Sequence, residues 1–213
     1  MPTSTHVLPK LIAVGFISVM AFCAGLYFAQ TGDRPSIPGL LWPNPPRVGA
    51  FSLTDSKSER LTEEALNGHW TLLFFGFTHC PDVCPTTLST LKTVHTQLSR
   101  GESFQAPLQV LFISIDPARD GPQTLHDYIQ YFDPAFLAAT GTDDELKKLT
   151  RQLGVIYAKV RTADPNTYTM DHSASVLLIG PDLALLGVFT PPLIAPELAD
   201  RVRAVIEFAQ KPT

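Results

Sequence analysis

The chain has 213 residues, of which 45% are hydrophobic, enough for one full-sized domain and a short additional segment. Its formal net charge is −4, and its sixteen Lys and Arg residues are scattered along the sequence. This pattern lacks the basic patch of a nucleic-acid-binding protein, so we expect no nucleic-acid partner.

The first feature along the chain is an uncharged apolar run at residues 11–29, which as a helix would extend about 28 Å, close to the thickness of a bilayer core. We predict a transmembrane anchor at residues 11–30. Lys10 precedes it and Asp33 follows it, so residues 1–10 are expected in the cytoplasm. A cleaved signal peptide is the alternative, but the run is longer than the usual hydrophobic region of about 7–15 residues and no clear cleavage site follows it.

Residues 31–47 are rich in proline, which favours an extended chain over packed structure. We interpret them as a spacer that holds the following domain away from the membrane. No long repeat or low-complexity tract interrupts residues 48–213, so they are predicted to form one domain.

Two apolar runs within that domain, residues 71–78 and 108–115, predict buried strands. Apolar residues recur at helical spacing between them, after Pro85, which suits the first turn of a helix. Three further helices are expected at residues 123–132, 142–153 and 196–209, and three further strands at 155–160, 175–179 and 185–189. Thr142 and Glu145 form a capping-box pattern at the start of the middle helix. The pattern predicts an α/β sandwich with a central sheet.

Cys80 and Cys84 lie in the segment Cys-Pro-Asp-Val-Cys-Pro, after the first strand and at the opening of a helix. If the helix begins at Pro85, Cys84 occupies its N-cap, and the positive helix end favours thiolates. Two sulfurs one turn apart can bind a soft ion or close a disulfide, and the spacing allows both. The remaining cysteine, Cys23, lies in the apolar run and is expected to behave as a small hydrophobic residue.

A metal bound by these cysteines needs another ligand. Thiolates select Cu(I), zinc or iron–sulfur clusters, and a three-coordinate copper site needs only one more ligand, whereas zinc needs two. His172 belongs to a polar cluster, residues 168–173, before an apolar strand, where a loop could direct it toward the cysteines. His79 adjoins Cys80, but neighbouring side chains of an extended chain point to opposite sides, so we expect it to support the site. The other histidines are expected to be ordinary surface or core residues.

Three segments together, FGFTHCPDVCPTTL, SIDPARDGP and YTMDHS, resemble the Sco/SenC family of cytochrome c oxidase assembly proteins. The resemblance extends from about residue 49 to the C-terminus. It implies a thioredoxin-like fold that binds copper through the cysteines of a C-x-x-x-C-P motif and the histidine of a D-H-S motif. Those residues correspond to Cys80, Cys84 and His172, and the same cysteine pair is the expected redox-active disulfide.

Four polar residues are candidates for positions around these ligands: His79, Asp82, Asp116 and Asp171. Asp116 ends the second strong strand, at the same sheet edge as the cysteines, and orients a ligand or partner or else forms a turn. Asp82, between the cysteines, affects their pKa values, contacts a partner or forms a turn.

The resemblance implies a copper metallochaperone for the dinuclear copper site of cytochrome c oxidase, and hence a binding protein rather than a turnover enzyme. A thiol–disulfide oxidoreductase that reduces the copper-site cysteines of the oxidase subunit is the main alternative. A thiol peroxidase is less favoured, because no peroxide-activating arginine is evident. The expected partners are the copper-bearing oxidase subunit, another periplasmic copper carrier and the membrane. The short N-terminus without an Arg-rich presequence favours a bacterial inner membrane, with the domain in the periplasm.

Overall fold

The computed structural model describes residues 15, 17–24, 37–41, 43–101, 104–164 and 167–211. The chain divides into two compact units, Met1–Ser36 and Ile37–Thr213. In the first unit, residues 17–24 are helical. No helix among the described residues is long and apolar enough to cross a membrane, and most of the predicted anchor at residues 11–30 lies outside them.

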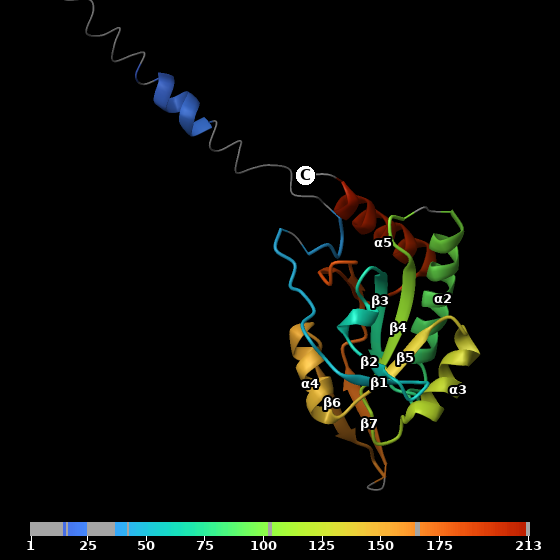
Figure 1. Cartoon of the computed structure of the whole chain (residues 1–213). Coiled ribbons are helices and arrows are strands. Elements are labelled where there is room, and N and C mark those ends of the chain that lie inside the picture. Colours follow the sequence, from blue (N-terminus) through green and yellow to red (C-terminus); the bar gives the residue numbers. More distant parts are fainter. Residues whose placement is uncertain are drawn as a thin grey trace, which may run out of the picture. The chain divides into compact units, whose positions relative to one another are not determined.

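The second unit is built on a sheet whose described strands are ordered β2-β1-β5-β4-β3-β8-β9 (Figure 1). Its central strands, β3 (Trp70–Gly76), β4 (Leu108–Ser114) and β5 (Leu137–Thr140), run parallel. The whole of β3 is buried, as its apolar run predicted. Gly76 is paired with Ser114, so the segments that follow β3 and β4 leave the sheet at the same edge.

The outer strands are antiparallel to their neighbours. β8 (Val176–Ile179) pairs with β3, and β9 (Leu185–Phe189) pairs with β8. At the other side, β1 (Leu53–Asp55) lies between β5 and β2 (Arg60–Leu61). The sequence did not predict β1, β2 or β5, because runs of two to four residues are too short to show a periodicity.

Helices cover the sheet and confirm the predicted α/β sandwich. α2 (Val83–Gly101) packs against α5 (Ala195–Gln210), and α3 (Pro122–Phe132) contacts β5 and α2. α4 (Asp143–Gln152) lies on the other side of the sheet from α2 (Figure 1). The predicted cap of α4 is present, because the Thr142 hydroxyl accepts a hydrogen bond from the Glu145 N–H at 3.3 Å.

A hairpin of β6 (Tyr157–Arg161) and β7 (Tyr168–His172) stands apart from the seven-stranded sheet. The sequence predicted β6 but interpreted residues 168–173 as a polar loop. They form a strand because β7 pairs with β6 along its length, with His172 opposite Tyr157. Most of β6 is exposed, so the hairpin's shape depends on this pairing and on a few tertiary contacts.

The second half of the predicted spacer is part of the domain. Leu40 forms a bridge with Gly187 in β9, Arg47 forms one with Ala184 just before β9, and the Val48 N–H donates to the Leu183 carbonyl at 2.8 Å. The compact unit accordingly begins at Ile37 and not at residue 48. Proline does not prevent this packing, because an edge segment can expose the positions that lack an N–H.

Candidate metal centre

The two cysteines of the predicted site lie at the junction between β3 and α2. The helix begins at Val83, two residues before the predicted start, so Cys84 lies in its first turn and not at its N-cap. Cys84 is fully buried, whereas Cys80 is partly exposed. The Cys84 N–H donates to the Cys80 sulfur at 3.4 Å, and both cysteines are free thiols. The sulfur of Cys80 thus occupies a capping position that hydroxyl or carboxylate oxygens usually take.

Gly76 makes room for the Cys84 sulfur at the end of β3. A Cβ atom at this position would lie 2.9 Å from the Cys84 Sγ and 2.8 Å from the Phe112 ring. Both distances are shorter than van der Waals contact, so any larger residue must displace the sulfur, the ring or both. The glycine therefore determines how closely the thiol approaches the sheet.

His172 reaches the cysteines from the hairpin. Its Nε2 lies 3.7 Å from the Cys84 Sγ, and its Nδ1 lies 3.2 Å from the Ser173 carbonyl oxygen. A carbonyl only accepts, so Nδ1 carries the proton and the lone pair of Nε2 faces the thiol. The edges of Phe74 and Phe77 flank the imidazole, with ring centroids 6.1 Å away. This is the arrangement of a metal-binding histidine oriented through its second nitrogen.

Burial controls the protonation of both groups. It raises the pKa of the Cys84 thiol far above its ordinary value, and it lowers the pKa of His172. For Cys84 this is the opposite of the predicted effect, because desolvation of the thiolate outweighs the helix end. At neutral pH the site therefore holds a protonated Cys84 and a neutral imidazole, and a metal that bound the Cys84 sulfur would have to displace its proton.

The two sulfurs and the imidazole nitrogen suit a soft metal ion, although they do not surround a common metal position in this structure. Cys84 contacts both Cys80 and His172. In the part of the chain that the structure describes, no three His, Cys, Asp or Glu side chains are already placed around a common metal position. Two sulfurs and one imidazole nitrogen suit Cu(I) or zinc, and a metal held by all three requires Cys80 and His172 to move toward a common position beside Cys84.

A family model described as SCO1/SenC matches residues 43–207, more than half of the chain. The chain belongs to the SCO1/SenC family. A Stutzerimonas stutzeri relative, provisionally named as copper-binding, is 36% identical over 171 residues, a match that covers 77% of this chain and 82% of the relative. Protein SCO2, mitochondrial, of Saccharomyces cerevisiae is 41% identical over 135 residues, covering 63% of this chain and 44% of the yeast protein. The chain thus spans less than half the length of that mitochondrial relative.

Solved Sco structures share the fold. Arabidopsis thaliana ScoI with copper bound matches with a TM-score of 0.69 and 34% identity, covering 76% of this chain and 98% of that one. Yeast Sco1 with copper bound matches with a TM-score of 0.69 and 31% identity, covering 79% and 91%. These matches confirm the thioredoxin-like α/β fold that the family resemblance implied.

Asp116 ties the hairpin of this SCO1/SenC domain to the sheet. It is buried just beyond β4, where it accepts a 2.8 Å hydrogen bond from the Tyr168 hydroxyl and pairs with the Arg119 guanidinium. Arg119 also lies over the Tyr168 ring, 3.9 Å from its centroid. Tyr168 begins the strand that ends in His172, so Asp116 holds the strand that carries the histidine. Asp116 also forms the turn considered from sequence, since its carbonyl accepts from the Arg119 N–H.

Asp120 is a site residue that sequence reasoning missed. It is completely buried and accepts hydrogen bonds from the Thr78 N–H, the Thr78 hydroxyl and the Ser114 hydroxyl at 2.8, 2.6 and 2.5 Å. It thereby fastens the segment before Cys80 to the end of β4. In the sequence, the signal for Asp120 was that it is a second aspartate, after Asp116, soon after β4, the strand that pairs with β3.

The other three candidates from the sequence, His79, Asp82 and Asp171, are exposed. His79 is exposed, and its Nδ1 lies 3.7 Å from a carboxylate oxygen of Asp120. Asp82 is exposed and accepts from the Thr86 hydroxyl at 3.3 Å, which is a local contact of a helix start. Asp171 is exposed, and its charge opposes the burial effect on the pKa of His172. None of the three contacts a cysteine sulfur among the described hydrogen bonds and ion pairs.

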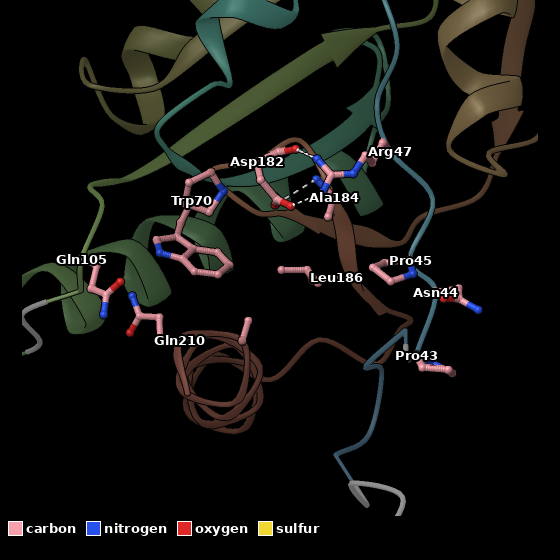
Figure 2. A pocket seen from close by; sticks show the side chains of 12 residues that line it. Pro43, Asn44, Pro45, Arg47, Trp70, Gln105, Asp182, Ala184, Leu186 and Gln210 are labelled. Carbon is pink, nitrogen blue, oxygen red and sulfur yellow. Dashed lines mark hydrogen bonds and ion pairs between the residues drawn. The ribbon is translucent and has the colours of Figure 1, made fainter. Parts of the chain in front are cut away.

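A cavity of about 610 Å³ lies at the opposite end of β3, beside Trp70 (Figure 2). The indole N–H of Trp70 and the amide N–H of Gln210 have no partner among the described residues. Both point toward the same corner of the cavity (Figure 2). The lining contains no thiol or imidazole, and we assign the cavity no part in metal binding.

Proposed function

We propose that this chain binds copper through the sulfurs of Cys80 and Cys84 and the Nε2 of His172, and that it assists assembly of the dinuclear copper site of cytochrome c oxidase. The observation that carries the proposal is the contact of Cys84 with both other ligands, one from the α2 turn and one from the hairpin. The copper-bound relatives support the choice of metal. The oxidase role follows from the family.

The chemistry of the three ligands favours copper over zinc. Two thiolates and one imidazole satisfy three-coordinate Cu(I), whereas a structural zinc site requires a fourth protein ligand. The nearby carboxylate of Asp120 is already committed to three hydrogen bonds, and Asp116 is committed to Tyr168 and Arg119. Copper is the cargo in this proposal, and the partly exposed Cys80 offers the side from which a recipient takes it.

The copper-binding experiment compares the full-length chain, purified in detergent, with His172→Ala and with His69→Ala as control. His69 precedes β3 and Cys80 follows it, so the control lies at the far end of the strand. We expect His172→Ala to lose most of its Cu(I) affinity in competition with a chromophoric chelator, and His69→Ala to match wild type. Unchanged affinity in His172→Ala would refute the ligand assignment.

A thiol–disulfide oxidoreductase is the second candidate, favoured by the adjacency of the two free thiols, with the Cys80 sulfur 3.4 Å from the Cys84 nitrogen. Cys80 and Cys84 would then form a redox-active disulfide while reducing the cysteines of the oxidase subunit. This activity does not need His172 as a ligand. Oxidase assembly that remains normal in a His172→Ala strain but fails in Cys80→Ser would favour the oxidoreductase, whereas failure in both favours the chaperone.

We further propose that residues 11–30 anchor the chain in a bacterial inner membrane, with residues 1–10 in the cytoplasm, residues 31–36 as a spacer and the domain from Ile37 onward in the periplasm. The uncharged run supports the anchor. Protease added to spheroplasts should then digest the domain while intact cells protect it. Protection that persists in spheroplasts and ends only on lysis would contradict the orientation. The copper-bearing oxidase subunit and another periplasmic copper carrier are the proposed partners.

A further inference from the structure

The cavity beside Trp70 is separate from the metal centre. Trp70 begins β3 and Cys80 follows the other end of this strand, whose seven residues extend about 23 Å. The cavity has a volume of about 610 Å³, which lies within the range of about 300–1,000 Å³ that is typical of small-molecule sites. One water molecule takes up only about 30 Å³ of liquid volume, so the cavity has room for an organic ligand.

The indole N–H of Trp70 lies in the lining of this cavity without an acceptor among the residues that the structure describes (Figure 2). Trp70 is 3% exposed, and its backbone N–H donates to the Pro107 carbonyl at 2.9 Å, so the residue is held in place. A buried donor that is left unpaired is costly, and phenylalanine would avoid the cost. The indole therefore indicates an acceptor that enters the cavity from outside.

A second buried donor lies at the same corner of the cavity. The side-chain N–H of Gln210, the last residue of α5, also lacks a partner in the described part of the chain. Figure 2 shows this amide and the Trp70 indole nitrogen directed toward one corner. Two unpaired donors at one corner are matched by a carbonyl oxygen, because it carries two lone pairs and no proton.

The rest of the described lining favours an uncharged ligand. Its charged side chains are Arg47 and Asp182, and they pair with each other: the guanidinium donates to the Asp182 carbonyl at 2.6 Å and to its carboxylate at 2.8 Å. A ligand carboxylate at the Trp70 corner would lose its hydration without gaining a free cation. Much of the remaining wall is apolar and consists of Pro43, Pro45, Pro181, Ala184 and Leu186.

We propose that this cavity binds a small, uncharged organic ligand whose carbonyl oxygen accepts a hydrogen bond from the Trp70 indole. The Gln210 amide is a second donor to the same group, and the apolar part of the ligand packs against Leu186 and the prolines. The site contains none of the proposed copper ligands, so it binds its ligand without the metal.

The test titrates the full-length chain in detergent with acetophenone. Ethylbenzene, which lacks the carbonyl, and benzoate, which is charged, are the matched probes, each compared at the same free concentration. The chain has two tryptophans, so Trp42→Phe assigns the indole N–H resonance of Trp70. We expect acetophenone to shift this resonance downfield until the site is saturated. Ethylbenzene should bind more weakly and without the downfield shift, and benzoate should also bind more weakly than acetophenone.

Gln210→Leu removes the second donor from the cavity. We expect this variant to bind acetophenone about fivefold more weakly, the effect of one hydrogen bond between neutral groups, and to bind ethylbenzene as wild type does. Gln130→Leu is the matched control, because Gln130 is exposed on α3 and does not line the cavity. It should bind both probes with wild-type affinity.

Three outcomes would overturn the inference. The first is a Trp70 resonance that does not respond to acetophenone. The second is binding of ethylbenzene or benzoate as tight as that of acetophenone. The third is an upfield move of the Trp70 resonance in ligand-free Gln210→Leu, which would mean that Gln210 already accepts the indole N–H. None of these measurements involves copper, so each of them leaves the copper-binding proposal standing.

Discussion

The two arms of the candidate site are built differently. The cysteine arm continues from β3, which is buried throughout, and Asp120 fastens it to β4 through Thr78 and Ser114. The histidine arm is a two-stranded hairpin outside the main sheet, held near its turn by the Tyr168 contacts with Asp116 and Arg119. A rigid arm presents the sulfurs, and a tethered arm brings the imidazole to them. This division suits the proposed binding and release of copper.

The largest expected effect comes from the rigid arm. Cys84→Ser removes the group that contacts both other ligands, and we expect Cu(I) affinity to fall by more than about a hundredfold, since losing a supporting residue alone costs about 10–100-fold. Chelator competition measures it. Cys23→Ser is the matched control, because it also removes one thiol but lies in the other compact unit. Equal losses in the two variants would contradict the assignment.

Gly76→Ala tests how tightly the rigid arm is packed. The new methyl group would meet the Cys84 sulfur and the Phe112 ring at 2.9 and 2.8 Å. We expect the free energy of unfolding to fall by about 1–3 kcal/mol, the usual cost of overpacking. Urea unfolding measures it. Gly121→Ala serves as control, because its Cβ would meet nothing within 4 Å. A Gly76→Ala protein as stable as the control would mean that the end of β3 accommodates the methyl group without a loss of stability.

Tyr168→Phe tests the tether of the histidine arm. It removes the 2.8 Å hydrogen bond to Asp116 while keeping the ring beneath Arg119. We expect about a tenfold loss of Cu(I) affinity, as for other residues that orient a metal-binding histidine. The free energy of unfolding should fall by only about 1 kcal/mol. If stability falls with no change in affinity, the hairpin does not position His172.

The smallest effect expected is the pH dependence of metal-free stability. His172 has a lowered pKa, so the unfolded chain binds more protons and stability is lost as pH falls through the ordinary value of 6.5. Cys84 has a raised pKa, so its contribution is complete below the ordinary value of 9.0 and declines as pH rises above it. Urea unfolding across pH, with chelator present, should show His172→Ala weakening the acid decline and Cys84→Ala the alkaline one. Unaltered pH profiles in both variants would argue against burial as the cause.

Several tertiary features had little or no local signal. Asp120 acts on Thr78, which precedes it by many residues, and the two meet only because β3 and β4 run parallel in register. The edge segments at residues 37–41 and 43–48 resembled a spacer because proline suits both extended linkers and edge pairing. The strand that carries His172 has a polar composition, so its pairing with β6 decided its conformation.

The sequence by itself determined the family, the buried strand that ends beside Cys80, the helix that follows, and the cysteine pair at their junction. These depend on residues close together in the chain, whose apolar spacing and helix-start chemistry are readable locally. Tertiary structure decided the protonation of Cys84 and the reach of His172. A helix end alone favours a thiolate, but packing beneath the sheet edge removes water from the sulfur, and the free-energy cost of a buried charge is the larger effect.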